Sequence, residues 1–193
     1  MSPIVTVPSQ VLRTPTKPVT SLDTRVQKVI EDMYKTLRKT KNPQGVGLAA
    51  PQIGVSLKIF LARPDPNGEI SLFINPEIVK FSQKQIDPHK KKGVYEGCLS
   101  IPGHYAPVRR AMSVTVKYQT INNSPLLFPS LNLREGAGGE LLEKTEVFTG
   151  FPAHVIQHEM DHINGILFID RVLEQNVKLY KVKDKDDWEE VSL

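Results

Sequence analysis

The sequence predicts an α+β fold, a single domain in which mixed short β-sheets pack around a central helix. Three observations predict it: hydrophobic residues recur at helical spacing over 21–41, they alternate over 112–119 as in a half-buried strand, and a second helical segment follows at 149–165. The chain has 193 residues, of which 39% are hydrophobic and 24% charged, as is typical of a globular protein. We therefore expect one domain over 1–193.

The first predicted helix covers 21–41 and ends near Pro43. Its apolar stripe consists of Val26, Ile30, Met33 and Leu37. Such a stripe packs one face of a helix against the body of a protein. The glycines and small residues of 45–52 then indicate backbone that is tightly packed or closely approached.

Short strands are predicted at 58–62 and 71–74, and a longer one at 112–119. The segment 122–147 contains two prolines and the run Gly-Ala-Gly-Gly, and it ends in a strand-like stretch. A long hairpin or an elaborated loop fits this composition. Its role is not indicated by the sequence.

The second helix is predicted to begin with Thr149 as its cap and to end at Gly165. A last helix, capped by Asp170, would carry Leu173, Val177 and Tyr180 on one stripe. The charged tail from about 181 is expected to be loosely held.

The helix over 149–165 contains the spacing His-Glu-x-x-His, at His158, Glu159 and His162. Residues four apart project from the same face of a helix, so the two imidazoles can hold one metal ion. The adjacent glutamate can move protons, as in metal-dependent hydrolases. Without further context, such a pair of histidines is accidental or structural about as often as it binds a metal.

A catalytic site of this kind usually has three protein ligands and one open position. Cys98 follows a glycine and is the only cysteine in the chain, so it completes a coherent Cys-His-His set. A lone cysteine is more often a small buried hydrophobe. His154 is the alternative third ligand, but three histidines at successive turns of one straight helix rarely converge on a tetrahedral centre.

The composition limits the cellular locations and the classes of binding partner that we expect for this chain. A single cysteine excludes an intramolecular disulfide and favours a reducing, cytoplasmic location, with an organelle as the alternative if a presequence has been removed. No apolar run approaches the roughly 20 residues that span a membrane. The net charge of +4 is mild, so we expect no membrane association and no specific recognition of nucleic acid.

Three motifs now stand in order: GVGLAAPQ at 45–52, EGCLS at 96–100 and QHEMDH at 157–162. With them, the chain strongly resembles the peptide deformylase family. The flanking residues at 75–77, 101–102 and 164–168 also match, and the resemblance runs from residue 4 to about 173.

The resemblance implies an enzyme that removes the N-formyl group from the initiator methionine of nascent polypeptides and releases formate. It implies one divalent metal ion, Fe²⁺ in many members, with Zn²⁺, Ni²⁺ or Co²⁺ as alternatives, held by Cys98, His158 and His162. Glu159 would take a proton from water and pass it to the departing amine. The side-chain amide of Gln52 and the backbone N–H of Leu99 would stabilise the oxyanion.

The resemblance also implies roles around the metal. Gly47 would lie where the backbone meets the substrate, and Glu96, Arg110 and Asp161 would be structural support, with Arg110 bracing Glu96. The expected pocket for the methionine side chain is formed by Val46, Val94, Phe151, His154 and Val155. His154 stands where the family usually has an apolar residue, which would make this pocket more polar.

The substrate implies work close to the ribosome, with transient ribosome contact, although the C-terminal part lacks the long basic helix that some members use there. Two other functions remain in competition. One is a His-Glu-x-x-His metalloendopeptidase, against which Cys98 and Gln52 argue. The other is a non-catalytic binder of formylated peptides, against which the intact Glu159 and Gln52 argue.

Overall fold

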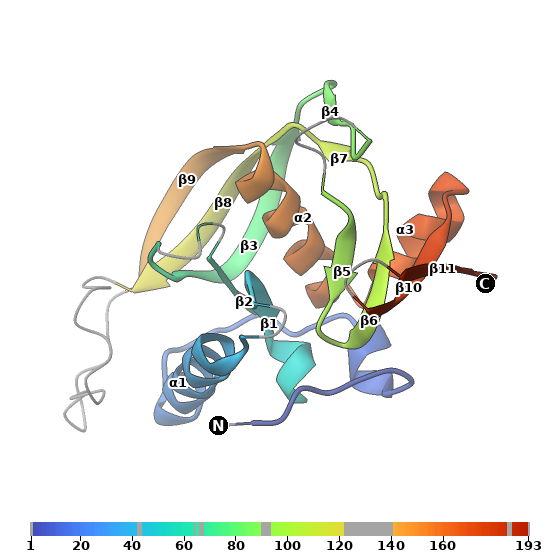
Figure 1. The fold of residues 1–193 in the computed structure, drawn as a ribbon. Helices are drawn as coiled ribbons and strands as arrows, with labels where there is room; N and C mark the ends of the chain where they lie inside the picture. Colours follow the sequence, from blue (N-terminus) through green and yellow to red (C-terminus); the bar gives the residue numbers. More distant parts are fainter. Residues whose placement is uncertain are drawn as a thin grey trace.

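The computed structural model describes residues 2–41, 44–63, 65, 68–89, 94–121, 141–184 and 187–192. It confirms the predicted α+β architecture, with helix α2 (Phe151–Ile163) between a five-stranded sheet and a group of shorter strands (Figure 1). The five-stranded sheet is antiparallel throughout and consists, in spatial order, of β1 (Gly47–Ala49), β2 (Ile59–Ala62), β3 (Ser71–Phe81), β8 (Ser113–Ile121) and β9 (Leu141–Thr149).

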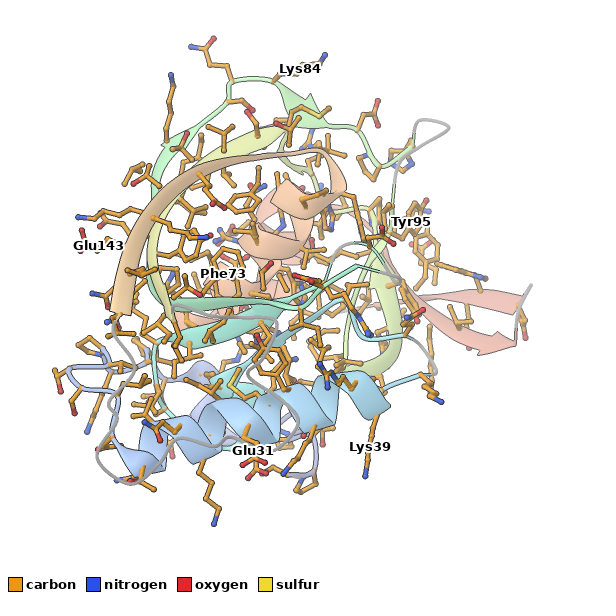
Figure 2. All side chains as sticks on the ribbon, turned by 90° about the vertical axis from the view of Figure 1, so that its left-hand side faces the viewer. Glu31, Lys39, Phe73, Lys84, Tyr95 and Glu143 are labelled. Carbon is orange, nitrogen blue, oxygen red and sulfur yellow. The ribbon has the colours of Figure 1, made fainter. Side chains whose placement is uncertain are left out.

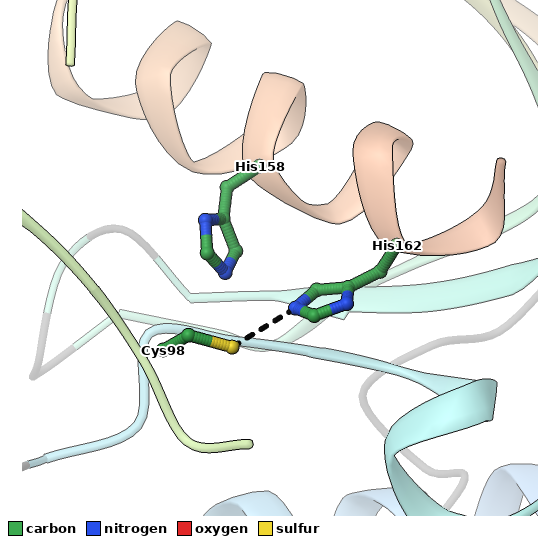
Figure 3. Close-up of side chains that lie close together, drawn as sticks. All are labelled: Cys98, His158 and His162. Carbon is green, nitrogen blue, oxygen red and sulfur yellow. Dashed lines mark hydrogen bonds between the residues drawn. The ribbon is translucent and has the colours of Figure 1, made fainter. Parts of the chain in front are cut away.

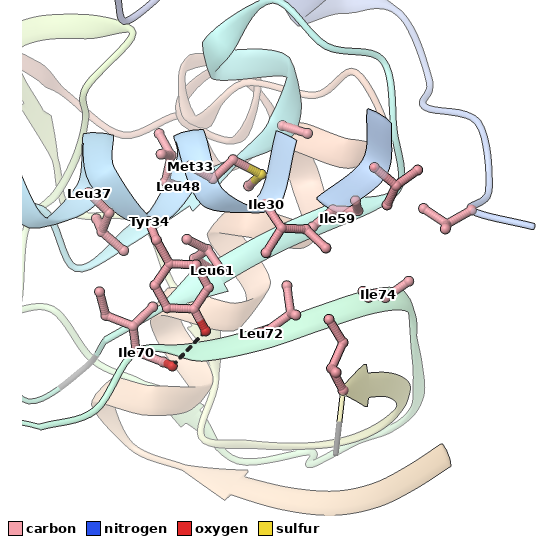
Figure 4. Packing of buried hydrophobic residues seen from close by; sticks show 14 of the residues in the cluster. Ile30, Met33, Tyr34, Leu37, Leu48, Ile59, Leu61, Ile70, Leu72 and Ile74 are labelled. Carbon is pink, nitrogen blue, oxygen red and sulfur yellow. Dashed lines mark hydrogen bonds between the residues drawn. The ribbon is translucent and has the colours of Figure 1, made fainter. Parts of the chain in front are cut away.

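Each face of this sheet supports a different helix. Alternate strand residues point to opposite faces, so neighbouring positions contribute to different cores. Helix α1 (Thr24–Lys39) covers the face that carries Leu48, Ile59, Leu61, Leu72 and Ile74 (Figure 4). Helix α2 packs against the face that carries Ala49, Phe60, Ala62, Phe73, Val114 and Val116. The sheet thereby fixes the position of α2.

Helix α1 begins where the side chain of Asp23 accepts a hydrogen bond from the Val26 amide at 2.8 Å, a standard N-cap. The predicted apolar stripe of this helix is buried. Tyr34 joins it, and its buried hydroxyl donates to the carbonyl of Ile70 at 3.1 Å (Figure 4). The prediction for this helix is therefore confirmed, with three fewer residues at its start and two fewer at its end.

A second sheet has four antiparallel strands, β11 (Asp187–Val191), β10 (Leu179–Asp184), β6 (Ile101–Ala106) and β5 (Glu96–Cys98), in that order. It packs with the 3-10 helix η1 (Gln10–Arg13) and with α3 (Phe168–Gln175) around a third core. Two short strands, β4 (Gln85–Ile86) and β7 (Arg110–Ala111), form a separate pair. A further 3-10 helix, η2 (Ala50–Ile53), follows β1.

The last predicted helix is present, but it is shorter than expected. Helix α3 ends at Gln175, because Asn176 adopts a left-handed conformation with φ of 50°, and Tyr180 lies on β10 instead of on a helix. Asp170 lies in the first turn of α3, where its carboxylate accepts from the Leu167 amide at 2.7 Å. The tail differs as well, since β10 and β11 form a hairpin beside β6 (Figure 1).

The start of α2 also differs from the prediction. Gly150, not Thr149, precedes the first turn of α2, and its φ of 70° suits glycine. The predicted long hairpin or loop at 122–147 falls largely outside the described residues, which resume at Leu141 with β9. Among the described residues, no helix is long and apolar enough to cross a membrane.

Candidate metal centre and adjoining pocket

The structure brings Cys98, His158 and His162 together, as Figure 3 shows. One ligand atom from each residue lies within 4.8 Å of the others, and the Cys98 Sγ is 3.1 Å from Nε2 of His162. The two histidines lie one turn apart on α2, and Cys98 ends strand β5. Among the described residues, this is the one group of three or more such side chains that could hold a metal ion.

The donors at this cluster fit a divalent transition metal. One thiolate and two imidazoles form a ligand set that suits iron, zinc, nickel and cobalt. Burial by itself would raise the pKa of the Cys98 thiol, but the adjacent His162 and His158 lower it to about 5. The sulfur is thus prepared to act as an anionic ligand near neutral pH.

Glu96 holds two histidines in orientation. Its buried carboxylate accepts from Nδ1 of His158 at 2.7 Å and lies 3.0 Å from Nε2 of His154. Because Nδ1 of His158 is engaged, Nε2 of this ring is the atom that faces the cluster. His154 therefore contacts Glu96, and it does not belong to the group of ligands.

Glu96 is in turn the end of a buried chain of charges. Arg110 donates to both of its oxygens, at 2.9 and 2.6 Å, and also to Asp161 at 2.6 Å. Arg171, on α3, donates twice to Asp161, at 3.0 and 2.6 Å. Although burial opposes it, Arg110 and His158 hold the pKa of Glu96 well below its usual range. The expected Glu96–Arg110 contact is present, and Arg171 is a member that the sequence did not indicate.

Glu159 is buried on α2, directly against strand β1. A β-carbon at Gly47 would lie 2.1 Å from its Oε1, so only glycine leaves room for this carboxylate. Its other oxygen, Oε2, is buried and has no protein hydrogen-bond partner among the described residues. Burial raises the pKa of Glu159 to about 7, against the opposing effect of His158 and His162. A carboxylate of this kind can accept or donate a proton near neutral pH.

The side chain of Gln52 has a fixed direction. Its Oε1 accepts from the Ala49 amide at 2.8 Å, so its NH₂ group faces the Cys98 sulfur at 3.6 Å and the Ser100 hydroxyl at 3.3 Å. Gln52 lies on η2, and it is 1% exposed. Ser100 was not singled out from the sequence, although it closes the motif at 96–100 that contains Cys98.

A cavity of about 300 Å³ adjoins the cluster. The predicted site residues that line it are Val46, Gly47, Gln52, Val94, Glu96, Cys98, Leu99, Phe151, His154, Val155, His158 and Glu159. His162, Arg110 and Asp161 lie behind this wall, outside the lining. The lining also contains Tyr95, His104 and Tyr105, which the sequence did not indicate.

The comparisons with known proteins agree on one family. A profile described as "Polypeptide deformylase" matches residues 1–128 and 139–178. The chain is 38% identical over 186 residues to a peptide deformylase of Desulfotalea psychrophila, with 94% of each chain covered. It is 36% identical over 187 residues to one of Dehalococcoides mccartyi, covering 97% of this chain and 95% of the relative.

Solved structures give the same result. The fold is similar to that of peptide deformylase from Thermotoga maritima, with a TM-score of 0.68, 36% identity, and coverage of 89% of this chain and 97% of the other. It is also similar to peptide deformylase 1B from Arabidopsis thaliana in complex with an inhibitor, with a TM-score of 0.69, 30% identity, and coverage of 90% and 82%.

Proposed function

The chain belongs to the peptide deformylase family of hydrolases, and we propose that Cys98, His158 and His162 form the metal centre at which it removes the formyl group from the initiator methionine of nascent polypeptides. The observation that carries this proposal is the convergence of three ligand atoms within 4.8 Å at the wall of a cavity that also contains Glu159 and Gln52. A divalent ion held there would supply Lewis-acid chemistry, by lowering the pKa of a water molecule and polarising the formyl carbonyl.

Glu159 is the proton carrier in this proposal. Its Oε2 lies buried without a hydrogen-bond partner in the part of the chain that the structure describes, so it is available to a water molecule. It would take a proton from the attacking water and later deliver it to the leaving amine of methionine. The absence of a side chain at Gly47 gives the carboxylate the space that this role requires.

Gln52 and Leu99 are the proposed donors to the oxyanion. The Ala49 amide fixes the Gln52 side chain so that its NH₂ group faces the cluster, and the donor needs no reorganisation during the reaction. Leu99 follows Cys98 directly and lines the same cavity, which places its backbone near the attacked carbonyl in our proposal. The formyl carbon, the attacking water and the two hydrogen-bond donors would thus lie together beside Cys98.

The methionine side chain would enter the part of the cavity lined by Val46, Val94, Phe151 and Val155. His154 shares this wall. Glu96 engages its Nε2, whereas its buried Nδ1 has no hydrogen-bond partner among the described residues. Glu96, Arg110 and Asp161 would act as support, since their hydrogen bonds connect His158 to Arg171 on α3.

Fe²⁺ is the ion we propose, on the basis of the family resemblance, because the ligand set itself suits Zn²⁺, Ni²⁺ and Co²⁺ as well. Metal analysis of protein purified without oxygen tests this choice. We also propose that the enzyme works in the cytoplasm, in transient contact with ribosomes that carry its substrate. Co-sedimentation of the protein with translating ribosomes, compared with empty ribosomes, tests the contact.

Formate release tests the function itself. We expect the metal-loaded protein to release formate from formyl-Met-Ala-Ser, and Glu159→Ala to lower the rate by about 10²–10⁴-fold while it keeps the metal. Glu69→Ala, at an exposed glutamate outside the cavity lining, is the matched control and should retain full activity. Cleavage of casein would point to an endopeptidase, and peptide binding without turnover would point to a non-catalytic binder.

A further inference from the structure

Strand β9 forms one edge of the five-stranded sheet. Its nine residues, Leu141–Thr149, pair with β8 at every position and without a bulge. Among the described residues, no strand pairs with the other side of β9. Figure 2 views the molecule from this side and shows Glu143 of β9 at the outside of the molecule. The backbone N–H and C=O groups along this edge can therefore bind a further strand.

The middle of β9 carries opposite charges on one face of the sheet. Residues 143–147 are all exposed. Lys144 and Glu146 are two positions apart, so their side chains point to the same face, and Nζ of the lysine lies 3.8 Å from Oε1 of the glutamate. These two side chains are 45% and 46% exposed, which leaves both of them accessible to charges on a neighbouring strand.

A second copy of the chain can pair with this edge in a few registers only. Residues that lie opposite each other in an antiparallel sheet point to the same face, so the two-fold axis between two copies of β9 must pass through a residue. Thr145 is the middle residue of the strand. With the axis at Thr145, all nine positions overlap, and Lys144 of each copy lies opposite Glu146 of the other.

The neighbouring registers lack this complementarity. An axis at Lys144 would place the two copies of this lysine opposite each other, and an axis at Glu146 would do the same with the glutamate. Like charges directly opposite each other destabilise a pair of strands, whereas opposite charges stabilise it. Charged residues on an edge strand commonly discourage pairing, but here they select one register.

We propose that the chain forms a homodimer in which two β9 strands pair in antiparallel orientation about Thr145. The two five-stranded sheets would then join into one continuous sheet. Leu142 of each copy would lie opposite Phe148 of the other, on the same face as the charge pairs, and would add an apolar contact. Because β9 lies outside the cavity lining, this inference does not depend on the proposed function.

An exchange of charges tests the register. We expect wild-type protein to sediment with the mass of two chains at high micromolar concentration. In Lys144→Glu, and likewise in Glu146→Lys, both cross-strand pairs become like-charged, so the dissociation constant of the dimer should rise by about tenfold or more. An equimolar mixture of the two variants restores opposite charges at both pairs and should form a heterodimer.

The controls address charge and folding. Lys80→Glu makes the same change of charge at an exposed position of the central strand β3, and it should leave the dimer unchanged. Glu146→Lys also removes the hydrogen bond that the Tyr118 hydroxyl donates to Glu146, so thermal unfolding of each variant checks that it is folded.

A cysteine on the axis provides a second measurement that keeps both charges. Opposed residues of antiparallel strands have Cα atoms about 4.5–5.5 Å apart, a separation that suits a disulfide. Metal-loaded Thr145→Cys should therefore form a covalent dimer on mild oxidation. Glu143→Cys is the matched control, because the two copies of residue 143 would be offset by four positions, about 13 Å along the strands, and should not be linked.

The outcomes decide the proposal. A wild-type chain that stays monomeric would overturn it, and the edge would then be open to a partner of another sequence. A dimer that survives both charge variants, or a mixture that forms no heterodimer, would overturn the register, as would equal crosslinking of Thr145→Cys and Glu143→Cys. A heterodimer in the mixture together with a link at residue 145 alone would uphold the pairing of β9 strands.

Discussion

Gly47 and Glu159 are in direct apposition: a β-carbon on the glycine would lie 2.1 Å from Oε1 of the glutamate. Neither residue can move aside easily, because Gly47 belongs to a paired strand and Glu159 lies on the buried face of α2. The backbone of one element thus determines the position of a carboxylate on another. The proposed proton carrier is thus held in place by packing.

The first prediction concerns this apposition. Gly47→Ala should displace the Glu159 carboxylate and lower kcat by about 10²-fold or more, the usual contribution of a positioned general base. The three ligands do not touch residue 47, so metal content should remain one ion per chain by elemental analysis. Gly68→Ala, at a surface turn, is the control. A Gly47→Ala enzyme of normal kcat would mean that Glu159 does not need its observed position.

The second prediction concerns the buried charges behind the metal centre. Arg110→Ala would leave Glu96 and Asp161 without their shared partner in the interior, which should lower the free energy of unfolding by about 3–5 kcal/mol. Urea denaturation of the metal-loaded protein measures this change. Because Glu96 would also hold His158 less firmly, metal affinity should fall by about 10–100-fold.

Lys35→Ala provides the comparison for Arg110→Ala. Lys35 pairs with Glu31 one turn away on α1, at the surface, so its removal should cost no more than about 0.5 kcal/mol. Equal destabilisation by the two variants would show that the buried chain of charges contributes no more to stability than a surface pair.

The third prediction concerns Gln52. In Gln52→Glu, a carboxylate oxygen can still accept from the Ala49 amide, but the donor that faces the cluster is lost. We expect kcat to fall by about 10²–10³-fold, as when one oxyanion donor is removed. The free energy of unfolding should fall as well, because a buried carboxylate would face the Cys98 sulfur. Gln175→Glu on α3, whose side chain bonds to the backbone of Arg109, is the matched control. If Gln52→Glu raised KM and left kcat intact, the amide would serve in substrate binding only.

The fourth prediction concerns removal of the metal. A bound ion stabilises the folded state by about 4 kcal/mol when it is present at 1,000 times its dissociation constant, so chelation should lower Tm and addition of the ion should restore it. Scanning calorimetry measures both. In Cys98→Ser, where a ligand from the cluster is replaced by a harder and weaker one, the restoring shift should be much smaller. The same shift in both proteins would place the ion elsewhere.

The sequence predicted those parts of the site that depend on regular spacing. His158 and His162 project together because a helix repeats every 3.6 residues, and the stripe on α1 follows from the same rule. Cys98 could be named as a candidate from ligand chemistry, and Gln52 from the family resemblance. The structure places all four around one cavity or cluster, although their proposed roles await experiment.

Long-range strand pairing could not be predicted from the sequence. Tyr180 fitted the stripe of a last helix, but Asn176 ends α3 and the following residues pair with β6, a strand more than 70 positions earlier. The short strands β5 and β6 contain two glycines and a proline, so their composition gave no strand signal. Arg171 and Trp188 were missed because their contacts are with residues that only the fold brings near them.

The alternation of strand β1 has a consequence for how this chain can vary. Leu48 is buried against α1, whereas Gly47 and Ala49 face α2. Insertion or deletion of a single residue just before Leu48 would reverse these directions and drive a bulky side chain onto Glu159. Burial of Leu48 in the core beneath α1 therefore also fixes which strand residues face Glu159. A lineage that inserted or deleted one residue within β1 would displace the Glu159 carboxylate and disturb the packing of Leu48 at the same time.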